Sequence, residues 1–527
     1  MSGINQRKPE VEKSLAMRPS LVINVISNWV AVVANLIVGF LLTPYIIRSL
    51  GVAQYGIWTL VISIIGYYGL LDMGITAAIM RYTARYAGQK NYKALNESVN
   101  TSLTIFCLVG AAVALASLIA AEPLARFFNI EAADLSSFKH VIWLLGIAAG
   151  FMFTGTVLTV VILAHERFVI GNTIRVITTF LRGGLSFIVL YNGGGLAGLG
   201  WVYSGMAAFA IAANLVVIKL YLKHIKLSIG NINRTSAQAL LSFGFFSFII
   251  QIGIMLRTKL GAVVIGRYLD MDMVGVYGVA ALLFGHLMHL TISCSGVTQP
   301  RLAAIAGKDS GKGLTDVVLK YSVFVSNFAV GAGFVALLLC RDFFRLWLPE
   351  NFKDINTATT VFYILLLGLA PDLMTDVSSN ALQAIKKHPY YAYQTIVEGA
   401  ANLLLSILLV TRLGITGVAM GTAVTALIAK VVFQPIYCCR VIKLNWFEYM
   451  SKVFVKPILL AGFLMAVLGG GKMLFDATTY LQLALKGLIV LSLYLVLAYV
   501  FCFDGENRRV ISTWLKFKIS KKAAVAC

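Results

Sequence analysis

Long apolar stretches, each followed by a short polar segment, recur along the whole chain. A bilayer core about 30 Å thick is crossed by roughly 20 apolar residues in an α-helix. Such stretches predict an all-α polytopic membrane protein with about fourteen transmembrane helices, over residues 21–43, 54–80, 99–121, 141–163, 170–191, 196–219, 239–265, 272–297, 320–340, 357–383, 391–411, 414–437, 453–474 and 478–503. The break between the eleventh and twelfth spans depends on the short segment TRLG, residues 411–414.

Composition excludes a water-soluble fold. Apolar residues make up 59% of the 527 residues and charged residues only 13%, whereas soluble domains carry about 25% charged residues. The formal net charge of +22 is distributed unevenly among the loops. Alternate loops and the two termini hold 29 Lys and Arg residues and the opposite loops hold 9. Because basic loops stay in the cytoplasm, we expect both termini in the cytoplasm, and no nucleic-acid partner.

The ends of the chain are polar and basic. Residues 1–20 are interpreted as a cytoplasmic tail and residues 504–527 as a second one. Within the second tail, residues 508–522 mix Lys and Arg with large apolar side chains, which favours either an interfacial helix or a disordered segment. No loop is long enough to form a folded domain, which argues against an enzyme with chemistry on an external loop.

The sequence repeats at an offset of 219 residues. Matched pairs at that offset are Arg48 with Arg267, Leu50 with Leu269, Gly56 with Gly275, Gly195 with Gly414, and Gly198 with Gly417. The repeat predicts two pseudo-symmetric six-helix lobes, an N-lobe over residues 21–222 and a C-lobe over 236–437, with two added helices over 453–503. Six helices are an even number, so the lobes share one orientation, which is typical of a transporter that moves substrate between rocking lobes.

Several cations lie inside the predicted spans, where a charge at mid-bilayer costs about 2.5–3.5 kcal/mol even on gentler scales. Arg175 and Arg182 are seven residues apart on one face of the fifth span, and Arg257 and Lys259 lie in the seventh. These four residues predict a basic cavity wall that binds an anionic headgroup. For Lys259, as for Lys430 and Lys486, snorkelling to the interface is the alternative, and it is the favoured interpretation for Lys486.

Four acidic residues also lie within the spans: Asp72, Asp372, Asp376 and Glu398. Asp372 and Asp376 share one helical face just after Pro371, which should kink the tenth helix. These carboxylates are candidates for coupling to a proton or Na⁺. Structural ion pairs with the intramembrane arginines, or between Glu398 and Lys430, are the alternative.

No cofactor or metal site is expected. His286 and His289 share a helical face, but no third ligand is evident, so buried hydrogen-bonding histidines are the favoured interpretation. Trp58, together with Tyr67 and Tyr68, is a candidate for stacking on sugar rings, although a place in the interfacial aromatic belt is favoured for Trp58. The seven cysteines form no C-x-x-C pair.

Three stretches together resemble a known family. "RSLGVAQYGIWTLVISIIGYYGLLDMGITAAIMRY" (48–82) resembles the opening signature of the bacterial polysaccharide flippases, the Wzx-type transporters of the multidrug/oligosaccharidyl-lipid/polysaccharide flippase superfamily. "IGRYLDMDMVGVYGVA" (265–280) and "LGITGVAMGTAV" (413–424) resemble its second-half counterparts. The resemblance implies a V-shaped bundle of two six-helix lobes and a polyisoprenyl-pyrophosphate-linked oligosaccharide as substrate. It carries over no catalytic motif.

We therefore expect a transporter, not an enzyme. It would flip a lipid-linked oligosaccharide for O-antigen, capsule or exopolysaccharide to the outer leaflet, in the company of polysaccharide polymerase and glycosyltransferases. One alternative is a multidrug cation antiporter of the same superfamily, which should present an acidic or aromatic cavity. The other is a membrane polysaccharide polymerase or glycosyltransferase, which would need a sizeable external loop.

Overall fold

The computed structural model describes residues 19–508 except residues 244, 297, 300, 301, 303, 304, 306–311, 386, 387, 471–475 and 506. Most of the expected tail over residues 1–20 and nearly all of the segment over 508–522 lie outside the described residues. The described part of the chain contains helices and no β-strand. Its contacts divide it into two compact units, Met1–Phe248 and Ile249–Cys527.

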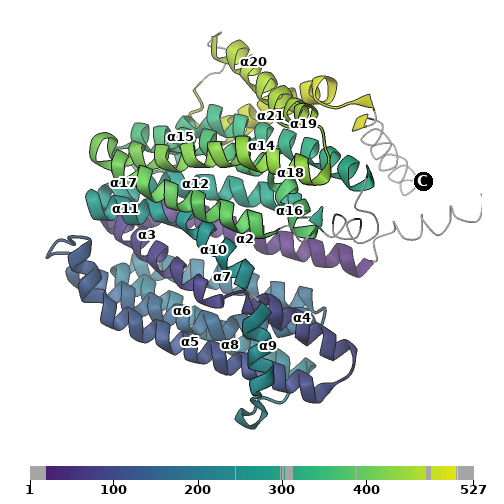
Figure 1. Ribbon diagram of the computed structural model, residues 1–527. Coiled ribbons are helices and arrows are strands. Elements are labelled where there is room, and N and C mark those ends of the chain that lie inside the picture. The colour runs from purple at the N-terminus through teal and green to yellow at the C-terminus, as the bar shows by residue number, and fades with distance from the viewer. Residues whose placement is uncertain are drawn as a thin grey trace, which may run out of the picture. The chain divides into compact units, whose positions relative to one another are not determined.

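The first unit is built from long apolar helices joined by tight turns. Its helices are α2 (Pro19–Leu50), α3 (Val52–Tyr67), η1 (Tyr68–Asp72), α4 (Ile75–Gly88), α5 (Tyr92–Phe127), α6 (Leu135–Ala164), α7 (Phe168–Tyr191), α8 (Gly195–Tyr221), η2 (Ile229–Asn231) and α9 (Arg234–Phe243). Figure 1 shows α5, α6 and α8 side by side, and α6 contacts both of its neighbours extensively.

The second unit begins within α10. Its helices are α10 (Phe245–Thr258), α11 (Leu260–Tyr268), α12 (Met271–Gly296), α14 (Lys312–Trp347), α15 (Ile355–Met374), α16 (Asp376–Ala384), α17 (His388–Leu427), the π-helix η3 (Ile428–Phe433), α18 (Gln434–Ile442), α19 (Trp446–Tyr449), the π-helix η4 (Met450–Val455), α20 (Lys456–Gly470) and α21 (Tyr480–Phe501). The two C-terminal helices belong to this unit, because both α20 and α21 pack against α14.

Small residues allow the helices of each unit to approach closely. A Cβ on Gly110 of α5 would lie 2.5 Å from the carbonyl oxygen of Gly150 in α6. In the second unit, a Cβ on Gly368 of α15 would lie 2.2 Å from the Cα of Ala423. Lipid tails are as apolar as the helix surfaces, so packing in membranes depends on such close backbone contacts.

The helices confirm the prediction of about fourteen spans. Within the described residues, twelve helices are long and apolar enough to cross a membrane, and the pair over Phe248–Thr258 and Leu260–Tyr268, bent by 45°, makes a thirteenth. One of the twelve, Tyr390–Ile442, has 53 residues. At 1.5 Å per residue it would be about 80 Å long, more than twice the thickness of a bilayer core, so it comprises two spans.

The break inside that long helix lies where the sequence places it. Gly414, the last residue of TRLG, has φ 59° and ψ −141°, which is not a helical conformation. Gly195 has φ 60° at the start of α8, so the matched glycines of the repeat share a positive φ. Glycine is the residue that adopts this conformation without strain from a Cβ. The turn is thus conserved between the two halves of the chain in its backbone as well as its sequence.

Two asparagine side chains of α5, Asn96 and Asn100, bind the segment that follows α8; we call this pair the clasp. The amide group of Asn96 donates to the carbonyl oxygen of His224 (3.0 Å) and accepts from the backbone N–H of Lys226 (2.6 Å). One turn later, Asn100 bonds in the same way to the carbonyl of Lys226 and the N–H of Ser228, both at 2.8 Å. These two side chains fix the segment against α5.

A related contact recurs in the second unit. Thr315, 219 residues after Asn96, donates from its Oγ1 to the carbonyl oxygen of Ile442 at 2.9 Å. Ile442, the last residue of α18, follows the second unit's sixth predicted span (414–437), as the segment held by Asn96 and Asn100 follows the sixth span of the first. The repeat is therefore visible in a tertiary hydrogen bond as well as in glycine turns.

Candidate functional site

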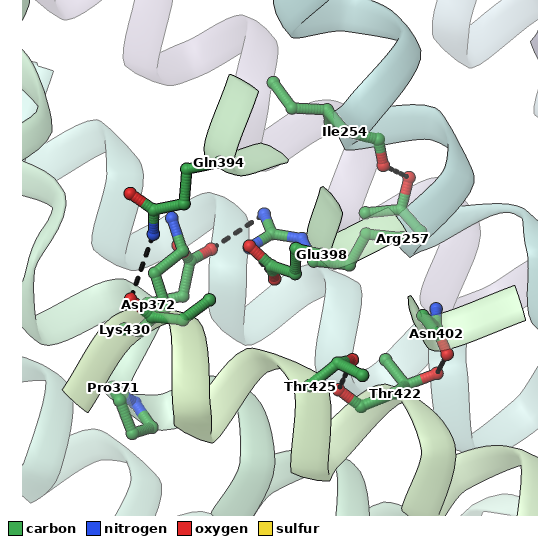
Figure 2. Close-up of polar contacts among 12 residues, drawn as sticks. Ile254, Arg257, Pro371, Asp372, Gln394, Glu398, Asn402, Thr422, Thr425 and Lys430 are labelled. Atoms are coloured by element: carbon green, nitrogen blue, oxygen red, sulfur yellow. Dashed lines mark hydrogen bonds and ion pairs between the residues drawn. The ribbon is translucent and has the colours of Figure 1, made fainter. Parts of the chain in front are cut away.

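The second unit contains a buried cluster of four charged side chains. Arg257 Nη2 lies 2.9 Å from Asp372 Oδ2, and Arg257 Nη1 lies 3.3 Å from Glu398 Oε1. Lys430 Nζ lies 2.9 Å from Asp372 Oδ1. Asp372 therefore bridges the two cations, as Figure 2 shows. We call these four residues the charge cluster.

Irregular backbone brings the charge cluster together. Arg257 lies in the last turn of α10, next to the bend at Lys259, and Asp372 follows Pro371 near the end of α15. Lys430 lies in the π-helix η3, which continues α17, the helix that carries Glu398. Bends and π-turns shift side chains out of the regular helical register and are frequent at functional sites.

Polar neighbours complete the surroundings of Lys430, whose side chain is fully buried. Its Nζ donates to Gln434 Oε1 at 2.9 Å and lies 5.0 Å from the ring centroid of Tyr391. The amide nitrogen of Gln434 donates in turn to the hydroxyl groups of Ser378 (3.1 Å) and Ser379 (2.6 Å). These bonds offset part of the cost of burying the cation.

The charge cluster is electrically neutral, since it contains two cations and two carboxylates. The structure thus places Arg257 in a double ion pair and not on an open basic surface, which is the alternative arrangement that the sequence allowed. Lys430 pairs with Asp372, not with Glu398. The sequence suggested a pair between Glu398 and Lys430. In the structure the bend at Lys259 brings Arg257 to Glu398 instead.

Buried polar atoms without partners line one face of α17. Gln394, Glu398 and Asn402 are spaced one turn apart, and their Oε1, Oε2 and Nδ2 atoms, respectively, have no hydrogen-bond partner among the described residues. Asn402 Oδ1 accepts from Thr422 Oγ1 at 3.1 Å. An unpartnered buried polar atom costs about 1–3 kcal/mol, so these atoms require an explanation beyond folding.

The other two candidate acids have local partners. Asp376 is the first residue of α16, and its Oδ2 accepts from Ser295 Oγ and from Asn380 Nδ2 (3.4 Å). Asp72 accepts from the backbone N–H of Thr76 (3.3 Å) and from its hydroxyl group, at the start of α4. Neither contacts a cation among the described residues.

The two predicted arginines of the first unit, unlike Arg257, are not held by ion pairs within the described residues. Arg175 is exposed, and its Nη2 donates to Asn172 Oδ1 at 2.8 Å. Arg182 is half-buried; its Nη2 donates to Asn35 Oδ1 at 3.4 Å, and its guanidinium lies 4.9 Å from the ring centroid of Tyr203. Within the described residues neither has a carboxylate partner, so their positive charges are not neutralised.

Lys259 and Lys486 differ from each other in whether an acidic side chain pairs with them. Lys259 is half-buried at the bend between α10 and α11 and has no acidic partner in the described part of the chain. Lys486, for which snorkelling to the interface was favoured, is only 5% exposed and lies 2.8 Å from Asp342 Oδ2. That interpretation of Lys486 was wrong, because an acid on α14 lies close enough to pair with it.

The structure also bears on the interpretations of Trp58 and His286. Trp58 is 4% exposed and packs edge-on against Tyr203, 5.0 Å between ring centroids, so it is not an interfacial belt residue. The Nε2 atom of His286 is buried without a partner among the described residues, which do not include a group of three metal-ligating side chains.

Sequence reasoning missed the amide side chains that surround the charged ones. Asn35 and Asn172 contact the arginines of α7, and Gln394 and Asn402 extend the polar face of α17. Spacing could have revealed them, because each lies a whole number of turns from another polar residue in an apolar helix. The pair Asp342 and Lys486 could not have been found this way, since its members are 144 residues apart.

The fold and the intramembrane charges define the class: this is a multi-pass membrane protein with a transporter architecture. A model of the family described as polysaccharide biosynthesis protein matches residues 21–306. The chain belongs to that family.

Relatives and solved structures agree with this membership. A protein of Shigella flexneri described as an O-antigen transporter is 21% identical over 75% of this chain and 92% of its own length. EpsK of Bacillus subtilis, described as an uncharacterized membrane protein, is 21% identical over 93% of this chain and 97% of its own. The structure of the lipid II flippase MurJ in an inward closed conformation matches with a TM-score of 0.70 and 16% identity, covering 91% of this chain and 99% of that one. An inward-facing multidrug resistance MATE transporter matches with a TM-score of 0.64 and 14% identity, covering 83% and 98%.

Proposed function

We propose that this protein is a flippase that moves a polyisoprenyl-pyrophosphate-linked oligosaccharide from the inner to the outer leaflet of the cytoplasmic membrane by alternating access. The observation that carries the proposal is the pair Arg175 and Arg182, two unneutralised guanidinium groups within one membrane-spanning helix. An arginine at membrane depth without a carboxylate partner needs an anion or water to offset its desolvation by lipid. Guanidinium groups match phosphate oxygens in geometry as well as in charge.

Family membership supports the same proposal, as do the names of relatives described as an O-antigen transporter, a low-salt glycan biosynthesis flippase and a flippase. The multidrug antiporter is a weaker candidate. Its fold matches too, but Arg175 and Arg182, two cations without a carboxylate partner among the described residues, do not suit a cationic substrate. Asp372 is moreover already paired with two cations. Polysaccharide polymerase and glycosyltransferases are proposed as neighbours that consume and supply the substrate.

A deletion strain complemented with plasmid-borne variants tests the function. Wild type should restore surface polysaccharide, and Arg175→Gln combined with Arg182→Gln should not, while lipid-linked units accumulate in the inner leaflet. Arg126→Gln is the matched control, because Arg126 pairs with Glu122 at the end of α5. Normal polysaccharide in the double variant, or drug hypersensitivity as the only phenotype of the deletion, would contradict the proposal.

We further propose that Glu398 carries the coupling ion, as a proton. Both oxygens of Asp372 are occupied by cations, and Asp376 accepts two hydrogen bonds. Glu398 has one oxygen on Arg257 and one without a partner. A proton on Glu398 would weaken its hold on Arg257. Glu398→Gln should abolish the dependence of transport on a pH gradient in proteoliposomes, whereas Asp376→Asn should retain it; dependence on Na⁺ instead of pH would overturn the proton.

The proposed location is the bacterial cytoplasmic membrane with both termini in the cytoplasm. The uneven distribution of Lys and Arg among the loops supports this orientation. A green fluorescent protein fused to the C-terminus should fluoresce, because that protein folds in the cytoplasm, and an alkaline phosphatase fusion at the same place should be inactive. The reverse result would invert the topology.

A further inference from the structure

The helix α2 has two chemically different faces. Asn24, Asn28 and Asn35 are spaced by four and seven residues, so they lie on one face of the helix. The opposite face contributes Ile26, Val33 and other apolar side chains to a groove that α7 closes with Phe180. A helix surrounded only by lipid has no need of amides, so the asparagine face meets a polar environment.

Hydrogen bonds join α2 to α7 at two levels, and the second of them uses the asparagine face. At the first level, Asn172 Nδ2 donates to Ser27 Oγ at 2.9 Å while Asn172 Oδ1 accepts from Arg175. At the second level, Asn35 Oδ1 accepts from Arg182. The two helices run in the same direction, because both partners advance along the sequence from the first level to the second. Arg175 and Arg182, seven residues apart, are separated by about 10 Å along α7.

Donor and acceptor groups on this face are unused. The amide nitrogen of Asn35 has no partner in the described part of the chain, and neither does any side-chain atom of Asn28. Both residues are exposed within the first span. An unpaired amide at membrane depth costs several kcal/mol unless water or a ligand satisfies it. Among the described residues, Arg182 therefore lacks a counter-ion and lies beside Asn35, whose amide nitrogen lacks a partner. Asn28 and Arg175 each stand seven residues earlier on these parallel helices, so they come to a similar height.

We propose that Asn28 and Asn35 bind sugar hydroxyl groups of the lipid-linked glycan, next to the pyrophosphate held by Arg175 and Arg182. This inference rests on the proposed flippase function. A primary amide offers two donors and an acceptor, which complement hydroxyl groups that both donate and accept. An anion alone would need further cations and gains little from an amide oxygen. The alternation of guanidinium and amide fits a phosphate attached directly to a sugar.

The test compares two carriers that differ only in the sugar. Full-length protein in nanodiscs is titrated with undecaprenyl pyrophosphate and, separately, with undecaprenyl pyrophosphate bearing one glucose, galactose or N-acetylglucosamine residue. Asn28→Leu should weaken binding of at least one sugar-bearing carrier about tenfold and leave binding of the bare carrier unchanged. Arg175→Gln with Arg182→Gln should weaken both. Asn192→Leu, at the end of α7, is the control and should change neither.

Two further results keep the inference separate from the function. If Asn28→Leu and Asn35→Leu leave the affinity for every sugar-bearing carrier unchanged, the amides only face water and the inference fails while the flippase proposal stands. Equal loss of both carriers would show that the amides merely position the arginines, which also overturns it. If wild type binds no carrier at all, the proposed function itself fails.

Discussion

At the scale of single residues, the decisive distinction is between charges with partners and charges without them. Lys486 and Asp342 form a buried ion pair, and their side chains are 5% and 8% exposed. Neither residue is close in sequence to the unpartnered polar atoms of α17. Removing one member of such a pair leaves an isolated charge in a dry interior. Arg175 and Arg182 already lack carboxylate partners, so replacing them creates no such charge.

Lys486→Met should therefore destabilise the protein by about 3–5 kcal/mol through the stranded carboxylate of Asp342. Combining it with Asp342→Leu should recover most of that loss. Lys452→Met is the comparison, because Lys452 is a partly exposed lysine paired with Glu448 and Asp504, and such pairs contribute about 1 kcal/mol or less. Thermal unfolding of the purified protein measures all three. A similar loss in the single and double variants would contradict the argument.

At the scale of elements, the backbone breaks were the most predictable feature. The TRLG segment gave the boundary between two spans, and the structure shows a non-helical Gly414 there. Gly261 lies two residues after the bend at Lys259, and Pro435 lies two residues after the π-helix that carries Lys430. Neither residue type specifies how far the neighbouring side chains shift, so the arrangement of the charges was not predictable. The partners within the charge cluster depend on these irregularities. For that reason the position of Lys430 along its helix suggested Glu398 as its partner, and not Asp372.

Gly414→Ala should cost about 1–3 kcal/mol, because its φ of 59° with ψ of −141° is accessible essentially to glycine alone. Gly462→Ala in α20 is the matched control: a Cβ there meets nothing within 4 Å, and alanine favours a helix. It should be neutral or slightly stabilising. Thermal unfolding compares the two variants, and an equally tolerated Gly414→Ala would show that the turn is not a structural requirement of the repeat.

The clasp on α5 is an element that pH should loosen. His165 Nδ1 lies 2.8 Å from the carbonyl oxygen of Val161, to which it donates, so its Nε2 accepts from His224 Nε2, 3.1 Å away. Burial, and then the nearby His165, lower the pKa of His224 below its ordinary value of 6.5. Because folding lowers the pKa of His224, its contribution to the stability of the segment held by Asn96 and Asn100 is complete above pH 6.5. That contribution is lost as the pH falls through the lowered pKa.

Hydrogen exchange measures this effect directly. The backbone N–H groups of Lys226 and Ser228, which donate to Asn96 and Asn100, should lose protection as the solution is acidified below pH 6.5. His224→Gln should remove most of that pH dependence, because glutamine does not titrate. Protection that stays constant from pH 8 to pH 5 in the unaltered protein would show that the histidine pair does not hold the segment.

At the scale of the whole molecule, the two halves share matched glycine turns but not their charges. Residues 219 positions before the charge cluster are Val38, Phe153, Thr179 and Ile211, and none of them is charged. Conversely, Gln394 and Ala401 stand 219 positions after Arg175 and Arg182. Since the first half folds without a charge cluster, the cluster is not a requirement of the repeat. This comparison favours a functional origin for the charges of both halves.

The last prediction separates folding from transport. A variant in which all four charges become apolar (Arg257→Met, Asp372→Leu, Glu398→Leu and Lys430→Met) should fold and insert, because replacing whole buried ion pairs is often neutral or stabilising by about 1–4 kcal/mol. Lys430→Met alone should be destabilised by about 3–5 kcal/mol, because Asp372 then keeps only Arg257. The fourfold variant should nevertheless fail to restore surface polysaccharide in the deletion strain. Unfolding of that variant would make the cluster structural, and normal export by it would exclude the cluster from transport.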